Sequence, residues 1–131
     1  MYLLDTNVCV GFLKAQPAIT EKLTAVPPGD LYLCSVVKAE LYYGARASQQ
    51  VARNLATLDV FFEPYTSLGF DDGCASRYGE LRADLRRMGQ LIGPNDTMIA
   101  ATALVHKLTL VTHNTREFSR VPGLRLEDWE A

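Results

Sequence analysis

Acidic side chains are spaced along this 131-residue chain so that several of them could hold a divalent cation. Asp5 directly follows a short apolar segment, residues 1–4, that is typical of a buried strand. Glu40 and Asp96 lie in the first turns of predicted helices, and Glu117 follows another apolar segment. Mg²⁺ and Mn²⁺ prefer oxygen ligands such as these carboxylates, and a bound ion can activate water and neutralise charge on a phosphodiester.

Each of these acids also has an interpretation that involves no ligand. Asp5 could cap a helix, and Asp96 could simply be stabilised by the positive end of a helix dipole. Asn114 and Glu117 match a capping box in which Asn replaces the usual Ser or Thr. Glu40 stands among apolar residues, where its charge needs either a cation or a basic neighbour. The residues alone leave both interpretations open.

Short apolar segments alternate with helical patterns along the whole chain. We expect strands at residues 1–4, 31–34, 61–65, 108–111 and 124–126, and helices at 6–13, 17–26, 35–46, 48–60, 70–88, from 93–94 onward and from 114. Thr6 or Asn7, Ser35 and Asn114 are the expected caps. The alternation predicts an α/β fold with a mainly parallel sheet. In such sheets the ligand site lies beyond the carboxyl ends of the strands, where Asp5 and the other acids fall.

The length and composition fit one globular domain, residues 1–131. Cys9, Cys34 and Cys74 are odd in number and far apart, which argues against a disulfide framework or a cysteine-based zinc site and suits a reducing cytoplasm. No signal peptide is recognisable, and the apolar runs are too short to span a bilayer. We therefore expect a cytoplasmic protein without a membrane segment.

The charge distribution does not by itself decide whether nucleic acid is a partner. The net charge of −2 counts mildly against one, because phosphate contacts are usually made by Lys and Arg. Four arginines nevertheless fall in one predicted helix: Arg77, Arg82, Arg86 and Arg87. They could form a local basic face or merely the solvated surface of that helix.

Four sequence blocks resemble the PIN-domain ribonucleases, and among them the VapC toxins of bacterial type II toxin–antitoxin systems. The blocks are LLDTN (3–7), SVVKAELYYG (35–44), IGPNDTMIAA (92–101) and VTHNTREF (111–118). The resemblance extends over almost the whole chain, to Trp129. It implies a PIN-like three-layer α/β/α sandwich whose core acids, Asp5, Glu40 and Asp96, bind Mg²⁺ or Mn²⁺.

The resemblance also implies roles for residues around these acids. Many family members carry an acid at the position of Asn114, whereas the subgroup with a TxNTREF pattern uses the glutamate matching Glu117. Glu117 is therefore the preferred fourth acid, and Asn114 a polar helper or cap. Thr6 and Thr112 are expected to orient carboxylates or metal-bound water.

The function implied is that of a toxin endoribonuclease that inhibits translation by cutting structured RNA. The expected substrate is tRNA, cleaved in the anticodon region, and among tRNAs the initiator tRNA is slightly favoured. A VapB antitoxin, whose tail can enter the active-site groove, and a second copy of the toxin are the expected partners. Phe12, Tyr42 and Tyr43 could serve these contacts, although at least half of them are expected to belong to the core.

Two other functions remain open from the residues. A phosphotransfer protein would use Asp5 as the phosphorylated nucleophile, but Asn7 replaces the second acid of the DxD arrangement found in such enzymes. A non-catalytic binding module would keep the PIN fold and leave its acids unused.

Overall fold

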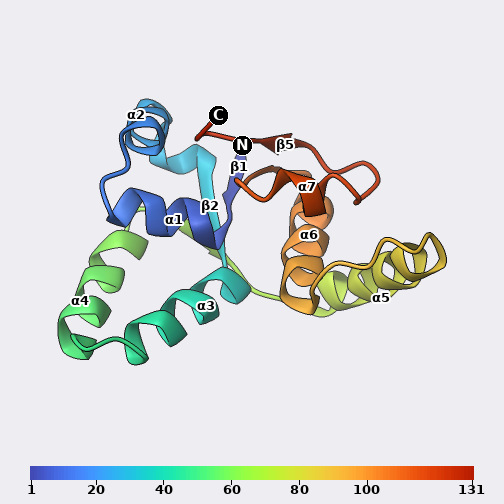
Figure 1. Cartoon of the computed structure of the whole chain (residues 1–131), viewed down its shortest axis with the longest axis horizontal. Coiled ribbons are helices and arrows are strands. Elements are labelled where there is room, and N and C mark those ends of the chain that lie inside the picture. Colours follow the sequence, from blue (N-terminus) through green and yellow to red (C-terminus); the bar gives the residue numbers. More distant parts are fainter.

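A five-stranded parallel sheet forms the centre of the computed structural model, which describes residues 1–131 (Figure 1). The strands are ordered β3-β2-β1-β4-β5, and every neighbouring pair is parallel. Their bounds are β1 (Tyr2–Leu4), β2 (Leu31–Cys34), β3 (Thr66–Leu68), β4 (Thr109–Val111) and β5 (Leu126–Glu127). The predicted α/β fold with a parallel sheet is confirmed.

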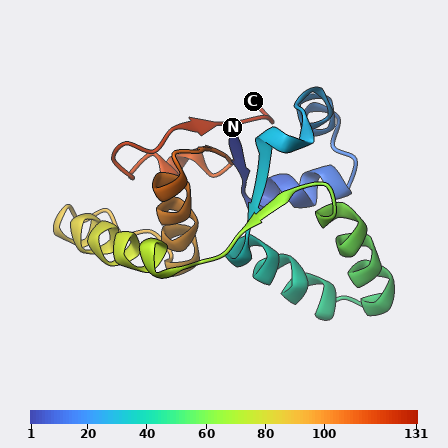
Figure 2. The ribbon, with the colours of Figure 1, turned by 180° about the vertical axis from the view of Figure 1, so that it is seen from behind.

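Helices cover both faces of this sheet. They are α1 (Thr6–Leu13), α2 (Pro17–Ala25), α3 (Ser35–Arg46), α4 (Val51–Phe62), α5 (Asp72–Arg87), α6 (Pro94–His106) and α7 (Thr115–Phe118), with a short 3₁₀ turn at Pro28–Asp30. Figures 1 and 2 show α1–α4 on one side and α5–α7 on the other. Right-handed crossovers require this division, because the chain steps from β1 to β3 in one direction and then returns to β4. The three-layer sandwich is therefore also confirmed.

The central strands β1, β2 and β4 are mostly apolar because helices bury both faces of the sheet there. Leu3, Leu4, Leu33, Leu110 and Val111 are fully buried within one core cluster of 27 residues. Such continuous apolar runs are typical of parallel sheets, and they leave polar side chains only where each strand ends. None of the helices combines the length and the apolar character needed to cross a lipid bilayer.

The prediction of a strand over residues 61–65 is wrong. Phe61 and Phe62 form the last turn of α4, and β3 begins only at Thr66. Aromatic content favoured a strand. However, Leu58, Phe61 and Phe62 lie three and four residues apart and are all buried, so they form the core-facing stripe of a helix. The last strand is also displaced, to Leu126–Glu127 from the predicted residues 124–126.

The helix caps differ from those expected. Asp5, and not Thr6 or Asn7, is the N-cap of α1, and its side chain accepts from the Thr6 N–H. Ser35 lies inside α3, whose N-cap is Cys34 without a side-chain bond. Asn114 occupies the N-cap position of α7, but its side chain does not cap the helix. Of these positions, only Asp5 therefore combines a capping bond with a place at the end of a strand.

Candidate active site

The carboxyl end of β1, the loop after β4 and the first turns of α3 and α6 meet at one pocket. Its lining residues are Asp5, Thr6, Asn7, Val10, Glu40, Asp96 and Asn114, and we call it the acidic pocket. The parallel register pairs Leu4 with Val111, and the Asp5 N–H donates to the Val111 carbonyl at 3.0 Å. The sheet therefore brings the residues that follow β1 and β4 together, although they are more than 100 positions apart in the sequence.

Asp5 is the most buried acid of the pocket, with 4% of its surface exposed. Its Oδ1 accepts from the Thr6 N–H at 2.8 Å, and its Oδ2 accepts from the Thr112 hydroxyl at 2.7 Å and the Asn7 amide at 3.4 Å. Burial raises the pKa of Asp5, the bonds from Thr112 and Thr6 lower it, and the charge of Glu40 raises it again. Asp5 is thus both a helix cap and a pocket acid.

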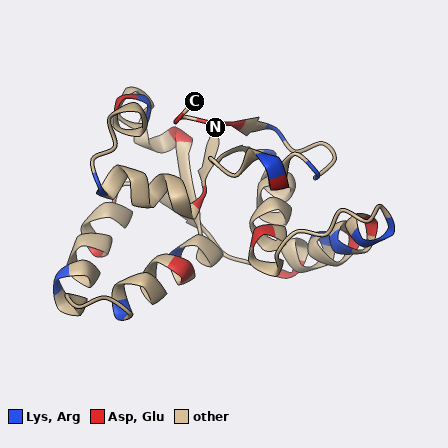
Figure 3. Cartoon of the chain, viewed as in Figure 1, with Lys and Arg blue, Asp and Glu red and all other residues tan.

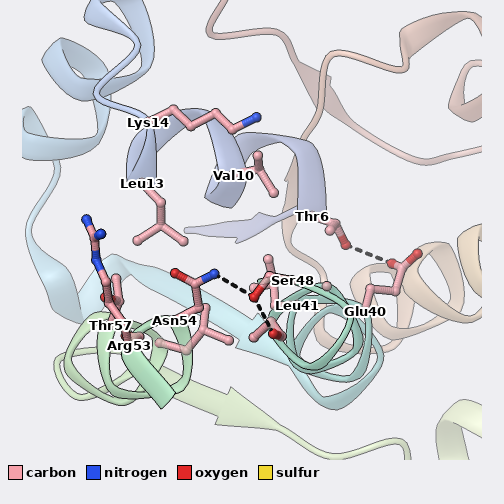
Figure 4. A pocket seen from close by; sticks show the side chains of 13 residues that line it. Thr6, Val10, Leu13, Lys14, Glu40, Leu41, Ser48, Arg53, Asn54 and Thr57 are labelled. Carbon is pink, nitrogen blue, oxygen red and sulfur yellow. Dashed lines mark hydrogen bonds between the residues drawn. The ribbon is translucent and has the colours of Figure 1, made fainter. Parts of the chain in front are cut away.

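Glu40 is held by a threonine rather than by a basic side chain. Its Oε1 accepts from the Thr6 hydroxyl at 2.7 Å (Figure 4). Lys38, a possible partner in the sequence, instead places its ammonium 4.7 Å from the centre of the Phe62 ring. None of the ion pairs in the structure includes Glu40. Its side chain is only half-buried, and no Lys or Arg lines the acidic pocket that it faces.

Asp96 has the most strongly perturbed carboxyl group of the pocket. Burial, followed by the charges of Asp5, Glu117 and Glu40, raises its pKa to about 6. A position in the first turn of α6 would by itself lower the pKa, because the helix dipole favours a negative charge there. The raised pKa is opposite in direction to the shift that the helix dipole alone would give.

The two candidates for a fourth acid position occupy different places. Asn114 lines the pocket, and its amide nitrogen lies 3.5 Å from Asp96 Oδ2. Its backbone N–H donates to the Thr112 hydroxyl at 2.9 Å, which fixes the hydroxyl that reaches Asp5. The capping-box interpretation of Asn114 is therefore wrong. Glu117 does not line the pocket, but its charge contributes to the raised pKa of Asp96.

Asn7 is a pocket residue to which the sequence assigned no role in the site. Its Nδ2 donates to Asp5, and its Oδ1 accepts from the His113 N–H at 3.3 Å. Asn7 therefore joins the start of α1 to the loop that carries Thr112 and Asn114. Its place beside Asp5 in the LLDTN block was the available signal, but the bond to His113 depends on the packing of distant segments.

The donor set of the acidic pocket fits a hard divalent cation. Asp5, Glu40 and Asp96 offer carboxylate oxygens, and no Lys or Arg lines the pocket to balance them. Burial together with mutual repulsion raises the pKa of Asp5 and of Asp96. A divalent cation would offset both penalties, and oxygen-only ligands suit Mg²⁺ or Mn²⁺.

Comparison with known proteins agrees with this fold. The PIN domain family model matches residues 2–124. A tRNA(fMet)-specific endonuclease VapC from Shigella flexneri is 43% identical over 128 residues, which cover 98% of this chain and 97% of that protein. The chain belongs to the PIN-domain family.

Solved structures place the chain within that family. VapBC2 from Rickettsia felis, bound to a promoter DNA fragment, superposes with a TM-score of 0.91 at 38% identity, covering 98% of each chain. DNA-bound VapBC from Salmonella typhimurium gives a TM-score of 0.92 at 40% identity, covering 98% of this chain and 97% of that one. The resemblance to VapC proteins seen in the sequence blocks is therefore confirmed.

Proposed function

We propose that this chain is a toxin endoribonuclease that hydrolyses RNA phosphodiesters with Mg²⁺ or Mn²⁺ held by Asp5, Glu40 and Asp96. The observation that carries the proposal is the convergence of these acids in one pocket without a basic partner. Such an arrangement costs folding stability, because like charges are brought together in a partly desolvated place. Without a bound cation, this loss of folding stability would have no compensating interaction.

The chain's own residues would position the ligands. The Thr112 hydroxyl, itself fixed by the Asn114 N–H, directs one oxygen of Asp5, and the Thr6 hydroxyl directs one oxygen of Glu40. Both carboxylates therefore keep one orientation when substrate arrives. Glu117 would add negative charge beside Asp96. A bound divalent cation would supply the Lewis acidity that lowers the pKa of a water and offsets charge on the scissile phosphate.

The proposed substrate is tRNA, cut in the anticodon region, with the initiator tRNA as first candidate. The 43% identical Shigella flexneri relative is named a tRNA(fMet)-specific endonuclease, which supports this choice. Two basic side chains, Lys14 and Arg53, line a groove between α1, α3 and α4 that also contains Thr6 and Glu40 (Figure 4). They could contact phosphates of an RNA that reaches the acidic pocket. Cutting such a tRNA would inhibit translation.

The proposed partner is a VapB-type antitoxin, because the structural relatives are VapBC complexes. The groove of Figure 4 is lined by Val10, Leu13, Leu41 and Leu58 beside polar residues, and it joins the acidic pocket at Glu40. An antitoxin segment in this groove would block access to the acids. A homodimer is proposed as the toxin's own assembly.

The exposure of Phe12, Tyr42 and Tyr43 shows which of these aromatic side chains are available for contacts with the partners. Phe12 packs 5.6 Å from Phe61 and is partly buried against the core, whereas Tyr42 packs edge-on against Phe62 at 5.5 Å but is 39% exposed. Tyr43 is 75% exposed and remains free for a contact. The expectation that at least half of Phe12, Tyr42 and Tyr43 belong to the core is therefore wrong, because only Phe12 is partly buried against it.

The test of the proposal is sequencing of new RNA 5′ ends after total RNA is incubated with the purified chain and Mg²⁺ or Mn²⁺. We expect cuts concentrated in a tRNA anticodon region, lost with EDTA and in Asp96→Asn. Asp84→Asn, which removes an aspartate of α5 whose side chain is 41% exposed, is the matched control and should cut normally. Cuts that are equally strong in Asp96→Asn would refute the proposed site.

The same experiment separates the alternatives. Absence of cleavage together with tight binding of a partner would make the chain a non-catalytic PIN module. A phosphotransfer role for Asp5 is disfavoured by its surroundings, since both of its oxygens accept hydrogen bonds and little of its surface is exposed.

A further inference from the structure

Three potential metal ligands converge outside the acidic pocket, where the C-terminal tail crosses the loop after β4. The Nδ1 atom of His113 lies 3.2 Å from Oδ2 of Asp128 and 3.3 Å from Oε2 of Glu130. The three ligand atoms all lie within 4.8 Å of one another. None of these three residues lines the acidic pocket, so the cluster is a separate feature of the molecule.

The geometry of this cluster is compatible with a bound cation. A protonated Nδ1 offers one N–H, yet two carboxylates approach the same nitrogen and also repel each other. Nitrogen and oxygen ligands lie about 2.0–2.2 Å from a tetrahedral zinc ion, which places neighbouring ligand atoms about 3.3–3.6 Å apart. The two distances from Nδ1, 3.2 and 3.3 Å, are close to that spacing.

The tail that carries the two acids is anchored independently of the histidine. Trp129, which lies between them in sequence, is buried, packs edge-on against Tyr2 at 5.4 Å and donates from Nε1 to Glu127. The Glu130 N–H donates to Asp128 Oδ1 at 3.0 Å, which fixes the aspartate. Both acid side chains are largely buried, at 19% and 26% exposed, so little side-chain entropy remains to be lost when a ligand binds.

We propose that His113, Asp128 and Glu130 form a second metal site, selective for a borderline transition metal such as Zn²⁺. An imidazole nitrogen beside two carboxylates favours Zn²⁺, Co²⁺ or Ni²⁺ over Mg²⁺, which prefers oxygen ligands alone. Three protein ligands leave the remaining position for water. The ion would fasten the tail to the loop whose His113 N–H bonds Asn7, and so stabilise the wall of the acidic pocket.

The chain contains only two histidines, which makes a direct test possible. Zn²⁺ is titrated into Asp96→Asn protein, which weakens cation binding in the acidic pocket, while the imidazole ¹⁵N signals of both histidines are followed by NMR. We expect a saturable shift of the His113 Nδ1 signal and none for His106. Calorimetry on the same background should show Zn²⁺ affinity falling about tenfold or more with Glu130→Gln and with His113→Ala, and unchanged with His106→Ala.

His113 is exposed, so its truncation should leave the fold intact, and the thermal unfolding curve of each variant provides a second readout. Zn²⁺ should raise the melting temperature of the Asp96→Asn protein but not that of Asp96→Asn/His113→Ala. The proposal is overturned if the His113 signal does not respond to Zn²⁺, or if His113→Ala binds Zn²⁺ as tightly as its parent. Either result would identify the cluster as hydrogen bonds and ion pairs only.

Discussion

Charged side chains are arranged in opposite ways in the acidic pocket and on α5. Along α5, charges of opposite sign pair within one turn: Arg77 contacts Glu80 at 2.9 Å, and Arg87 contacts Asp84. These pairs lie in solvent, and Figure 3 shows basic and acidic positions interspersed along that helix. These contacts are those expected if the arginine-rich segment is simply the solvated surface of a helix.

The acidic pocket instead gathers like charges where water is partly excluded. Asp5, Glu40 and Asp96 come from three separate elements, and none of them forms an ion pair. Exposed ion pairs such as those of α5 contribute little to stability, whereas an uncompensated group of carboxylates opposes folding. The difference indicates that the charges on α5 need no functional explanation, whereas those in the pocket do.

The largest expected difference between the two regions is in RNA cleavage. Asp5→Asn should lower kcat/KM by about 100-fold or more, the scale of removing one group that stabilises transition-state charge. Asp84→Asn on α5 should leave kcat/KM unchanged. Steady-state cleavage of a defined tRNA measures both, and equal losses in the two variants would contradict the distinction.

A smaller effect is expected when the acids are kept but their orientation is lost. Thr112→Val removes the hydroxyl that reaches Asp5 and should weaken Mn²⁺ binding in the pocket about tenfold. Thr102→Val is the matched control, since Thr102 is equally buried but lies away from the pocket and donates to the Met98 carbonyl of its own helix, at 2.8 Å. If both variants bind Mn²⁺ alike in calorimetry, Thr112 does not position Asp5.

Cation binding by the pocket should depend on pH in a range set by Asp96. Its pKa of about 6 means that a proton competes with the cation below that pH. We expect Mn²⁺ affinity to be nearly constant above pH 7 and to fall as the pH drops through 6. In Asp96→Asn, whose residual binding is weaker, the fall near pH 6 should disappear. A wild-type affinity that stays flat down to pH 5 would contradict the raised pKa.

The smallest expected effect is on the stability of the metal-free chain. Folding raises the pKa of Asp96 above its usual 3.8, so ionised Asp96 lowers the free energy of unfolding. This loss of stability is absent below about pH 4 and complete above about pH 6. Asp96→Asn should therefore be more stable than the parent at pH 8, on the order of 1 kcal/mol, and should lose this advantage at pH 4. Glu80→Gln on α5 should change stability by less than about 0.5 kcal/mol. Urea unfolding at the two pH values measures both.

The pocket acids could be predicted because their positions follow from local pattern and sheet topology. Asp5 ends an apolar strand and Asp96 begins a helix after Gly-Pro, and a parallel sheet brings such ends to one edge. The position of β3 could not be predicted in the same way. The aromatic pair Phe61 and Phe62 satisfies both strand and helix patterns locally, and only packing against the core decides between them.

The contacts of the C-terminal tail also could not be predicted from the local sequence pattern. The sequence does not indicate the partners of His113, because Asp128 and Glu130 are 15 and 17 positions away. Where the tail crosses the loop depends on β5 pairing with β4 and on the burial of Trp129. The distinct places of Asn114 and Glu117 likewise depend on how α7 packs, which spacing alone does not determine.

The most direct test of the account is whether the acidic pocket binds a divalent cation. Mn²⁺ is titrated calorimetrically into metal-free protein in a His113→Ala background, so that the tail cluster does not contribute. We predict saturable binding that is lost when Asp5→Asn and Asp96→Asn are combined and is retained when Glu80→Gln and Asp84→Asn are combined on α5. Equal Mn²⁺ binding by both double variants would contradict the assignment of the acidic pocket as the metal centre.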